Sequence, residues 1–334
     1  MTPSLSHYAW RDAAWRAAAE AWIRATLAGL GAAVTGEITQ PHLRAWSTVM
    51  RVPTDAGTMW FKACGPGSRY EPALMAAIER WAPGQAVAPV AIDVERAWSL
   101  SPDAGMTLRS VLAEDRDLSH WERVLPQYGQ LQYDLTAHAQ EMLALGVPDL
   151  RPERMPAHVE PLLDDPAAMM RGEEAGLTDD QHARLHALLP EYTAWCAELA
   201  SAGIGASLNH DDLHDNNVAV GTDGGYRFYD WGDASVAHPF TSLLVALRSL
   251  AYRFELKPDS AELHRVRDAY LEPWTTGHDR AALSRAAALA AKVAMVGRSL
   301  SWQRALLLAD PAERAEYADA VPGWLAELLA PDLS

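Results

Sequence analysis

The most constraining feature of the sequence is the uneven distribution of strand and helix patterns along its 334 residues. Short alternating segments bounded by turn residues fill the region from about 33 to 105, whereas long helical patterns follow Thr107. Only one later stretch, residues 207–234, interrupts those helices with strand-like segments. This order predicts an α+β chain with two lobes, a small antiparallel sheet followed by a larger helical part.

The N-terminal lobe is assigned to residues 1–105. Its predicted elements are an amphipathic helix within 1–31, strands over 32–40, 44–54 and 58–64, a helix over 70–81, and two short strands within 89–100. The helical lobe is assigned to residues 106–334. Its predicted elements are helices over 118–145, from Thr178 onward, and over 239–255, 259–273, 279–307 and 312–329, with strands over 217–220 and 226–230. Two lobes favour a ligand site between them.

Charge and cysteine content limit the partners of this chain. Its 28 lysines and arginines stand against 44 aspartates and glutamates, a net charge of −16, so no nucleic acid partner is expected. The surplus acid serves solubility or favours a cationic small molecule. The two cysteines cannot build a disulfide framework. Charged residues interrupt the N-terminal apolar run, so we expect a cytoplasmic protein with no membrane partner. As a separate expectation, the protein is a monomer or a homodimer.

The interrupting stretch concentrates polar side chains in a way that packing does not explain. Its segment 210–217 holds two histidines, three aspartates and two asparagines. Neighbouring carboxylates repel one another unless a cation or a reacting group lies among them. A further acid, Asp230, ends a strand-like segment at the distance from Asp212 that a hairpin spans. The stretch therefore predicts a chemical site.

Phosphoryl transfer requires a carboxylate that accepts a hydroxyl proton, oxygen ligands for Mg²⁺, and a cation on the nucleotide phosphates. The chain offers Asp212 for the first requirement, Asn217 and Asp230 for the second, and Lys62 for the third. Each of these residue types suits its task because catalysis of this kind depends on position and charge rather than on a covalent intermediate.

Lys62 is unusual because the chain has only three lysines among its 28 basic residues. It lies in the middle of an apolar strand, where an unpaired ammonium group is expensive. At 100° per residue Glu71 falls on the same helix face as Leu74 and Ile78, and we therefore predict Glu71 as its partner, with Glu79 in solvent. The alternative is a lysine on an edge strand that reaches water.

The pattern His210-x-Asp212-x-x-x-x-Asn217, followed by Asp230-Trp231-Gly232, resembles the catalytic loop and metal-binding motif of the protein-kinase-like superfamily. In detail, HDDLHDNN with YDWGDA resembles the aminoglycoside phosphotransferase family. The resemblance implies a bilobal protein-kinase-like fold, Asp212 as catalytic base, Asn217 and Asp230 as Mg²⁺ ligands, and loop-shaping histidines. Lys62 and Glu71 would then take part in binding ATP or GTP.

The resemblance implies a kinase that transfers the γ-phosphate to a hydroxyl of a small molecule. The acid around Asp212 favours a cationic acceptor such as an aminoglycoside or an amino sugar. The segment 39–48 departs from protein kinases because it has no glycine for close approach to phosphates. A catalytically silent nucleotide-binding module on the same fold therefore remains an alternative, as does a two-metal phosphohydrolase site at His210 and Asp211.

Several other residues have simple structural interpretations beside functional ones. Most of the thirteen tryptophans recur at helical spacing and are expected in the core. The remaining candidates are helix-packing or cleft residues (Trp302, Arg304), a helix cap or substrate-side acid (Asp233), a turn residue (His238), and acids that are solvated or attract a cation (Asp211, Asp215).

Overall fold

The computed structural model describes residues 7–221 and 224–330. The chain divides into two compact units, neither of which is one continuous segment. Unit 1 comprises Met1–Gly105, Arg227–Gly232 and Arg304–Glu316, and unit 2 comprises Met106–Tyr226, Asp233–Gln303 and Tyr317–Ser334. The sequence analysis divides the chain only once, after residue 105, and that assignment of two functional lobes stays a prediction.

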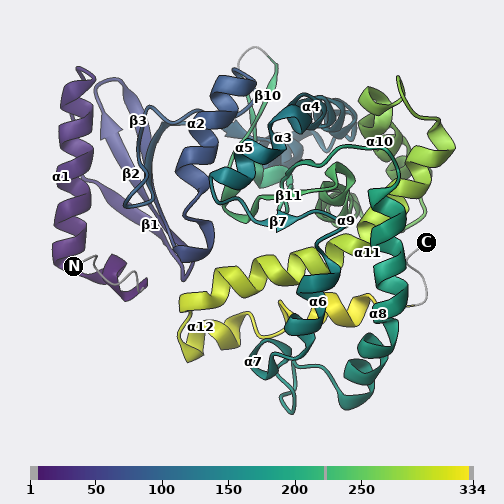
Figure 1. Cartoon of the computed structure of the whole chain (residues 1–334). Helices are drawn as coiled ribbons and strands as arrows, with labels where there is room; N and C mark the ends of the chain where they lie inside the picture. Colours follow the sequence, from purple (N-terminus) through teal and green to yellow (C-terminus); the bar gives the residue numbers. More distant parts are fainter. Residues whose placement is uncertain (1–6, 222–223, 331–334) are drawn as a thin grey trace. The chain divides into compact units, whose positions relative to one another are not determined.

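Unit 1 is built on a five-stranded antiparallel sheet in the order β1-β2-β3-β5-β4. Its strands are β1 Thr39–Leu43, β2 Ser47–Thr54, β3 Gly57–Cys64, β4 Ala91–Asp93 and β5 Trp98–Pro102, and its helices are α1 Ala13–Gly29, α2 Glu71–Trp81 and α12 Pro311–Glu316. Figure 1 shows α1 and α2 on opposite sides of the sheet. The predicted helix over 70–81 and the two strands within 89–100 are confirmed.

The apolar face of the sheet packs on α1. Asp12 caps this helix by accepting from the backbone N–H groups of Ala14 and Trp15. A buried cluster joins the two layers and includes three residues of α1 and seven from strands or their flanks: Ala19, Ile23, Leu27, Ile38, Met50, Val52, Phe61, Ala63, Trp98 and Leu100. Trp98 belongs to this cluster and Trp15 and Trp22 pack at its margin, so these three tryptophans belong to the core, as expected.

The first strand begins later than the sequence predicts. The structure places β1 at Thr39–Leu43 rather than at 32–40, and of that earlier segment Val34 makes an isolated bridge to Thr54. β1 is an edge strand with a register shift between Thr39 and His42, around Pro41. Proline is tolerated there because its missing N–H is not needed for a ladder on the outer side or at a bulge. The connection to β2 is therefore the short turn at residues 44–46.

Unit 2 is mainly helical, with two small sheets. Its helices are α3 Leu108–Asp115, α4 Ser119–Leu135, α5 Ala139–Ala144, α6 Pro156–Leu163, α7 Pro166–Met169, α8 Asp179–Ala200, α9 Leu243–Phe254, α10 Ala261–Leu271, α11 Arg280–Ala305 and α13 Pro322–Glu327. Its strands are β6 Met106–Thr107, β7 Asp149–Leu150, β8 Ser207–Asn209, β9 Val218–Val220 and β11 Ser235–Ala237, while β10 Tyr226–Phe228 begins in unit 2 and ends in unit 1.

Two helices of the sequence prediction are broken. The segment 118–145 is interrupted by a 3-10 turn at Thr136–His138, and the segment 312–329 is divided into α12 and α13. Pro322 opens α13 in its first turn, where the missing N–H costs nothing. In the described part of the chain, none of the helices combines the length and the apolar character needed to cross a bilayer.

The sequence analysis also missed the three-stranded sheet β7-β11-β8. Its strands have two or three residues each, too few for an alternating pattern to stand out. β8 and β11 pair antiparallel, with Asn209 opposite Ser235. This pairing brings the start of the 210–217 loop next to the chain that follows Gly232.

Candidate active site

Lys62 lies in the interior of the five-stranded sheet. Its strand β3 is between β2 and β5, and Lys62 pairs in register with Val49 on one side and Ser99 on the other. The alternative of an edge-strand lysine is therefore wrong. Since side chains alternate along a strand, Lys62 faces away from its buried neighbour Phe61, which packs in the α1 cluster.

Lys62 stands between two carboxylates within unit 1. Its Nζ is 2.8 Å from Glu71 of α2 and 2.6 Å from Oδ1 of Asp230. Glu71 is buried, and its Oε2 also accepts from the thiol of Cys64 at 3.1 Å. The predicted pairing of Lys62 with Glu71 is thus present. Glu79 accepts from the backbone N–H of Gly84 instead.

The charged side chains in this group shift one another's pKa values. Burial lowers the pKa of Lys62, but Asp230 and Glu71 outweigh it and raise that pKa well above its usual value, so the ammonium stays charged. Burial raises the pKa of Glu71, against the opposing effect of Lys62. Burial likewise raises the pKa of the Cys64 thiol, which therefore stays protonated as the donor to Glu71.

The turn after Asp230 is tightly fitted against Lys62 and Glu71. Asp230 has a φ of 65°, in the left-handed region that aspartate tolerates better than most residues. The hydroxyl of Tyr70 donates to the backbone oxygen of Gly232 at 2.7 Å. A Cβ at Gly232 would lie 3.2 Å from Oε2 of Glu71 and 3.7 Å from Nζ of Lys62. A methyl group at this position would therefore be crowded against the carboxylate of Glu71.

The loop 210–217 is anchored within unit 2 by side chains from α4. The backbone N–H of His210 donates to the hydroxyl of Tyr128 at 2.8 Å, and Gln132 donates to the backbone oxygen of Leu208 at 2.7 Å. Both α4 residues are fully buried. His210 and His214 then accept, through Nδ1, from the backbone N–H groups two residues further on. These contacts agree with loop-shaping histidines.

Asp212 and Asn217 meet inside this loop. Nδ2 of Asn217 donates to the backbone oxygen of Asp212 at 3.0 Å and lies 3.5 Å from its Oδ2. Nε2 of His214 is 3.4 Å from the same Oδ2. Asn217 is buried, whereas the side chain of Asp212 is 27% exposed and so remains accessible.

Arg298 of α11 contacts the predicted site residue Asp212, and sequence reasoning missed it. Its buried guanidinium places one nitrogen 2.7 Å from Oδ1 of Asp212 and the other 2.9 Å from Oδ2 of Asp233. A signal for it exists, because Arg298 is a lone charge in the run VAMVGRSLSW, where α11 is buried around most of its circumference. Arginine is seldom buried without a partner, but the sequence does not say which acid that partner is.

Arg298 also decides the charge state of Asp212. Burial by itself would raise the pKa of Asp212, but Arg298, His214 and His210 outweigh it and hold that pKa far below its usual value. The same contact raises the pKa of His214, against the lowering effect of its own burial. Asp212 is therefore a carboxylate at neutral pH, the form that a proton acceptor needs.

Three expectations about neighbouring acids are corrected. Asp215 is neither solvated nor open to a ligand, because it is buried between the guanidinium groups of Arg109 and Arg253, at 2.9 and 2.6 Å. Asp211 is also buried, and it accepts from Asn209 and Ser301. Of the two interpretations of Asp233, the helix cap is wrong because Asp233 pairs with Arg298, whereas a role on the substrate side stays a prediction.

Other expectations are met. His238 is a turn residue whose Nδ1 accepts from the backbone N–H of Phe240 at 3.3 Å. Trp302 packs on Tyr317, with ring centroids 5.3 Å apart, which agrees with a helix-packing role. The predicted site residues thus form two groups, Lys62, Glu71 and Asp230 in unit 1 and Asp212 and Asn217 in unit 2. The convergence of the two groups on one nucleotide stays a prediction.

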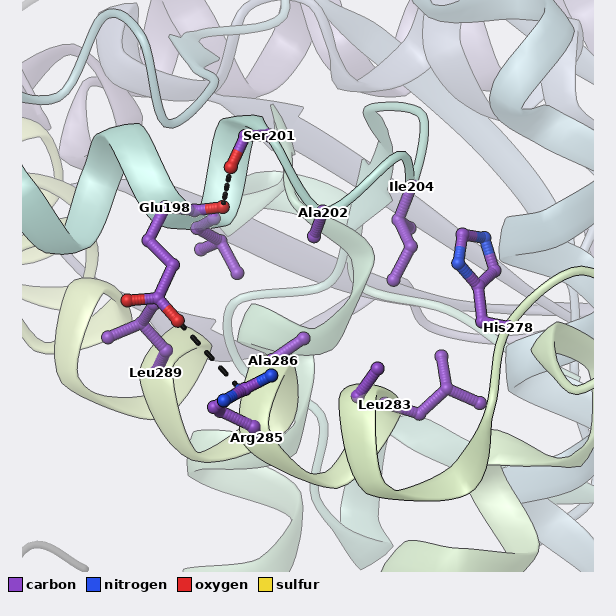
Figure 2. A pocket seen from close by; sticks show the side chains of 11 residues that line it. Glu198, Ser201, Ala202, Ile204, His278, Leu283, Arg285, Ala286 and Leu289 are labelled. Atoms are coloured by element: carbon purple, nitrogen blue, oxygen red, sulfur yellow. Dashed lines mark hydrogen bonds and ion pairs between the residues drawn. The ribbon is translucent and has the colours of Figure 1, made fainter.

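A separate pocket of about 190 Å³ lies within unit 2, between the end of α8 and the start of α11. Figure 2 shows its lining, which includes Glu198, Ser201, His278 and Arg285. Glu198 and Arg285 form an exposed ion pair at 4.0 Å. None of the predicted site residues lines this pocket.

Solved structures with a similar fold include three enzymes of low sequence identity. An ethanolamine kinase from Plasmodium vivax has a TM-score of 0.59 and 13% identity, covering 88% of this chain and 82% of that chain. The choline kinase LicA from Streptococcus pneumoniae has 0.57 and 14%, with 92% and 99% covered. The macrolide 2'-phosphotransferase MphH from Brachybacterium faecium has 0.53 and 18%, with 93% and 97% covered. These likenesses confirm the expected α+β, protein-kinase-like fold.

Residues 44–284 match the model of the phosphotransferase enzyme family, and this range includes all five predicted site residues. The chain belongs to this family. The resemblance based on the loop and Asp-Trp-Gly motifs is thereby confirmed, and so is the class of enzyme, a phosphotransferase. No match was found among curated protein sequences.

Proposed function

We propose that the protein transfers the γ-phosphate of ATP or GTP to a hydroxyl group of a small molecule. The observation that carries this proposal is Lys62 on a central strand, in contact with both Glu71 and Asp230. Phosphoryl transfer needs such a cation, held by acids, where the nucleotide phosphates bind. The ionised and accessible Asp212 is the group that accepts the proton of the acceptor hydroxyl.

The donor set fits Mg²⁺. Asp230 and Asn217 offer a carboxylate and an amide oxygen, the hard oxygen ligands that this ion prefers. Because Nδ2 of Asn217 donates to the backbone of Asp212, the amide oxygen is directed away from that contact. When bound, Mg²⁺ neutralises charge on the phosphates. Asn217 and Asp230 would hold it, while Lys62 would bind the phosphates and Asp212 would orient the acceptor.

The acceptor class is wider than the sequence alone favours. The expectation of a cationic acceptor depends on surplus acid around Asp212, yet arginines neutralise much of that acid. Arg109 and Arg253 flank Asp215, and Arg298 lies between Asp212 and Asp233. Local charge therefore no longer separates aminoglycosides and amino sugars from neutral sugars and polyols. Both kinds belong in the acceptor screen.

The test is a nucleotide-turnover screen of the full chain with Mg²⁺ and either ATP or GTP. The library pairs each cationic candidate with a neutral relative, for example glucosamine with glucose, and adds hydroxylated antibiotics and amino alcohols. We expect one acceptor class to consume nucleotide and to yield a phosphorylated product by mass spectrometry. Asp212→Asn provides the inactive reference, since it removes the proton acceptor with little change in shape.

The alternative of a silent nucleotide-binding module has a distinct outcome. Thermal stabilisation by nucleotide, with no transfer or hydrolysis across the whole library, would establish it. Absence of stabilisation by either nucleotide in the presence of Mg²⁺ would contradict both proposals.

A further inference from the structure

Arg298 divides the carboxylate of Asp212 into two unlike oxygens. Oδ1 accepts from Arg298 at 2.7 Å, a short charge-assisted hydrogen bond. The contacts of Oδ2 are longer, 3.4 Å to Nε2 of His214 and 3.5 Å to Nδ2 of Asn217. Hydrogen bonds of this kind are normally 2.7–3.2 Å. Oδ2 therefore keeps capacity to accept a proton, whereas Oδ1 is committed to the arginine.

Arg298 itself is held in place. Its side chain is 7% exposed, and its other terminal nitrogen donates to Asp233 at 2.9 Å. The guanidinium packs over the ring of Trp302 at 5.4 Å, and Trp302 in turn stacks on Tyr317. Because the guanidinium is a rigid planar group, rotation of the Asp212 carboxylate would break its hydrogen bond to Arg298 without forming another. The orientation of Asp212 is thus determined by α11.

We propose that Arg298 is a positioning residue for phosphoryl transfer, which holds Oδ1 of Asp212 so that Oδ2 receives the proton of the acceptor hydroxyl. This proposal rests on the function proposed above. As the acceptor oxygen bonds to the γ-phosphorus, the bond from phosphorus to the nucleoside diphosphate oxygen breaks. The proton moves from the acceptor hydroxyl to Oδ2, and the diphosphate leaves with the electron pair of the broken bond.

The experiment compares Arg298→Met, which keeps the length of the side chain without its charge, with Arg298→Lys, which keeps the charge without the fork. Arg285→Gln on the same helix is the control, because Arg285 is exposed and pairs only loosely with Glu198. We expect Arg298→Met to lower kcat about 100-fold, the effect of a small misplacement of a catalytic group, with KM for both substrates within about twofold. Arg298→Lys should recover part of kcat, and Arg285→Gln should match the parent.

Asp233→Asn is a second, milder test that still applies if the Arg298 variants fold poorly. It keeps the bond from Arg298 to Asp212 and weakens only the second anchor, so we expect a fall in kcat of about threefold to tenfold, corresponding to one weakened charge-assisted hydrogen bond. Unchanged kcat in Arg298→Met, with only a lower melting temperature, would show a structural role and overturn the proposal. Equal kcat in the Met and Lys variants would also overturn it.

Crystal structures of the parent and of Arg298→Met separate this inference from the proposed function. We expect Asp212 in one conformer in the parent and in more than one in the variant. A single unchanged conformer would contradict positioning by Arg298 whatever the turnover. A mobile Asp212 together with no transfer to any acceptor would mean that the positioning is real and that the proposed function fails.

Discussion

Lys62 and Arg298 each stand between two carboxylates, one pair in each compact unit. Lys62 contacts Glu71 and Asp230 through a single nitrogen, at 2.8 and 2.6 Å. Arg298 contacts Asp212 and Asp233 through two different nitrogens, at 2.7 and 2.9 Å. A lysine is a point charge on a flexible stem, whereas an arginine is a rigid fork.

This difference between the two side chains suits two separate tasks in phosphoryl transfer, nucleotide binding and proton acceptance. A point charge can exchange one acid for a phosphate oxygen without a change in its remaining contact, which suits nucleotide binding. A fork fixes the orientation of each acid that it holds, which suits a proton acceptor. We therefore expect variants of Lys62 to act on nucleotide affinity, and variants of Arg298 or of the Asp212 that it holds to act on the chemical step.

Asp212→Asn should have the largest effect. The amide cannot accept the proton, so we expect kcat to fall about 10²–10⁴-fold, the usual contribution of a general base. Nucleotide affinity, measured by calorimetry, should stay within about threefold. Asp134→Asn, an exposed aspartate of α4, is the control. Full turnover in Asp212→Asn would refute its role as base.

Lys62→Met should mainly lower nucleotide affinity, whereas Asp212→Asn mainly lowers kcat. Loss of one charge-assisted bond to the phosphates is expected to weaken nucleotide binding about 10-fold to 150-fold, measured by the same calorimetry. Lys62→Arg should bind nucleotide better than Lys62→Met but less well than the parent, because the fork does not fit between the same two acids. Unchanged affinity in Lys62→Met would break the comparison between the two cations.

Lys62 and Asp212 should lose their contributions to the stability of the protein at opposite ends of the pH range. The pKa of Lys62 is raised, so its contribution is complete below the unfolded value and is lost as pH rises through the folded value. The pKa of Asp212 is lowered, so its contribution is complete above its ordinary value and is lost as pH falls.

The measurement is the free energy of unfolding against pH, with a chelator present. The difference between the parent and Lys62→Met should shrink as pH rises above about 10.5, and that between the parent and Asp212→Asn should shrink as pH falls below about 4. The steepest slope for either is about 1.4 kcal/mol per pH unit. A Lys62 contribution that is lost near neutral pH, or an Asp212 contribution that persists well below about pH 4, would contradict the assigned charge states.

Gly232→Ala should have the smallest effect. The added methyl group would lie 3.2 Å from Oε2 of Glu71, so the carboxylate must move by a few tenths of an ångström. We expect nucleotide affinity to fall by about threefold, since one contact of Lys62 lengthens while the other remains. Gly277→Ala, where the structure shows open space, is the control. Equal affinities in the two variants would show that the turn can adapt.

The predicted elements divide according to how local their causes are. Helix α2 and strand β3 were predicted because their periods extend over 8 to 11 residues and end at turn residues. The first strand was predicted too early, at 32–40, whereas β1 includes Pro41, a residue that is disfavoured within most strands. Strands β7, β8 and β11 were missed because two or three residues carry no period.

The candidate site shows the same division. Asp212, Asn217 and Asp230 were found through their spacing, and Glu71 through the helical period that places it on the buried face of α2. The interpretations of Asp211 and Asp215 were wrong because their partners, such as Ser301 and Arg253, lie far along the chain. Residues that act through local geometry are visible in a sequence, whereas distant ion pairs are not.

By itself the sequence determined the order of strands and helices, the catalytic-loop and Asp-Trp-Gly motifs, and the need of a strand lysine for an acid on the next helix. The order of elements and the pairing of the lysine follow from the period of side chains along one element, whereas the two motifs are recognised by their resemblance to a family. Only the tertiary structure decided that Arg298, 86 positions after Asp212, holds that aspartate, and that β8 and β11 bring Asp233 to the same guanidinium. Such contacts depend on how whole helices pack, and the side-chain period of α11 does not say which acids Arg298 meets.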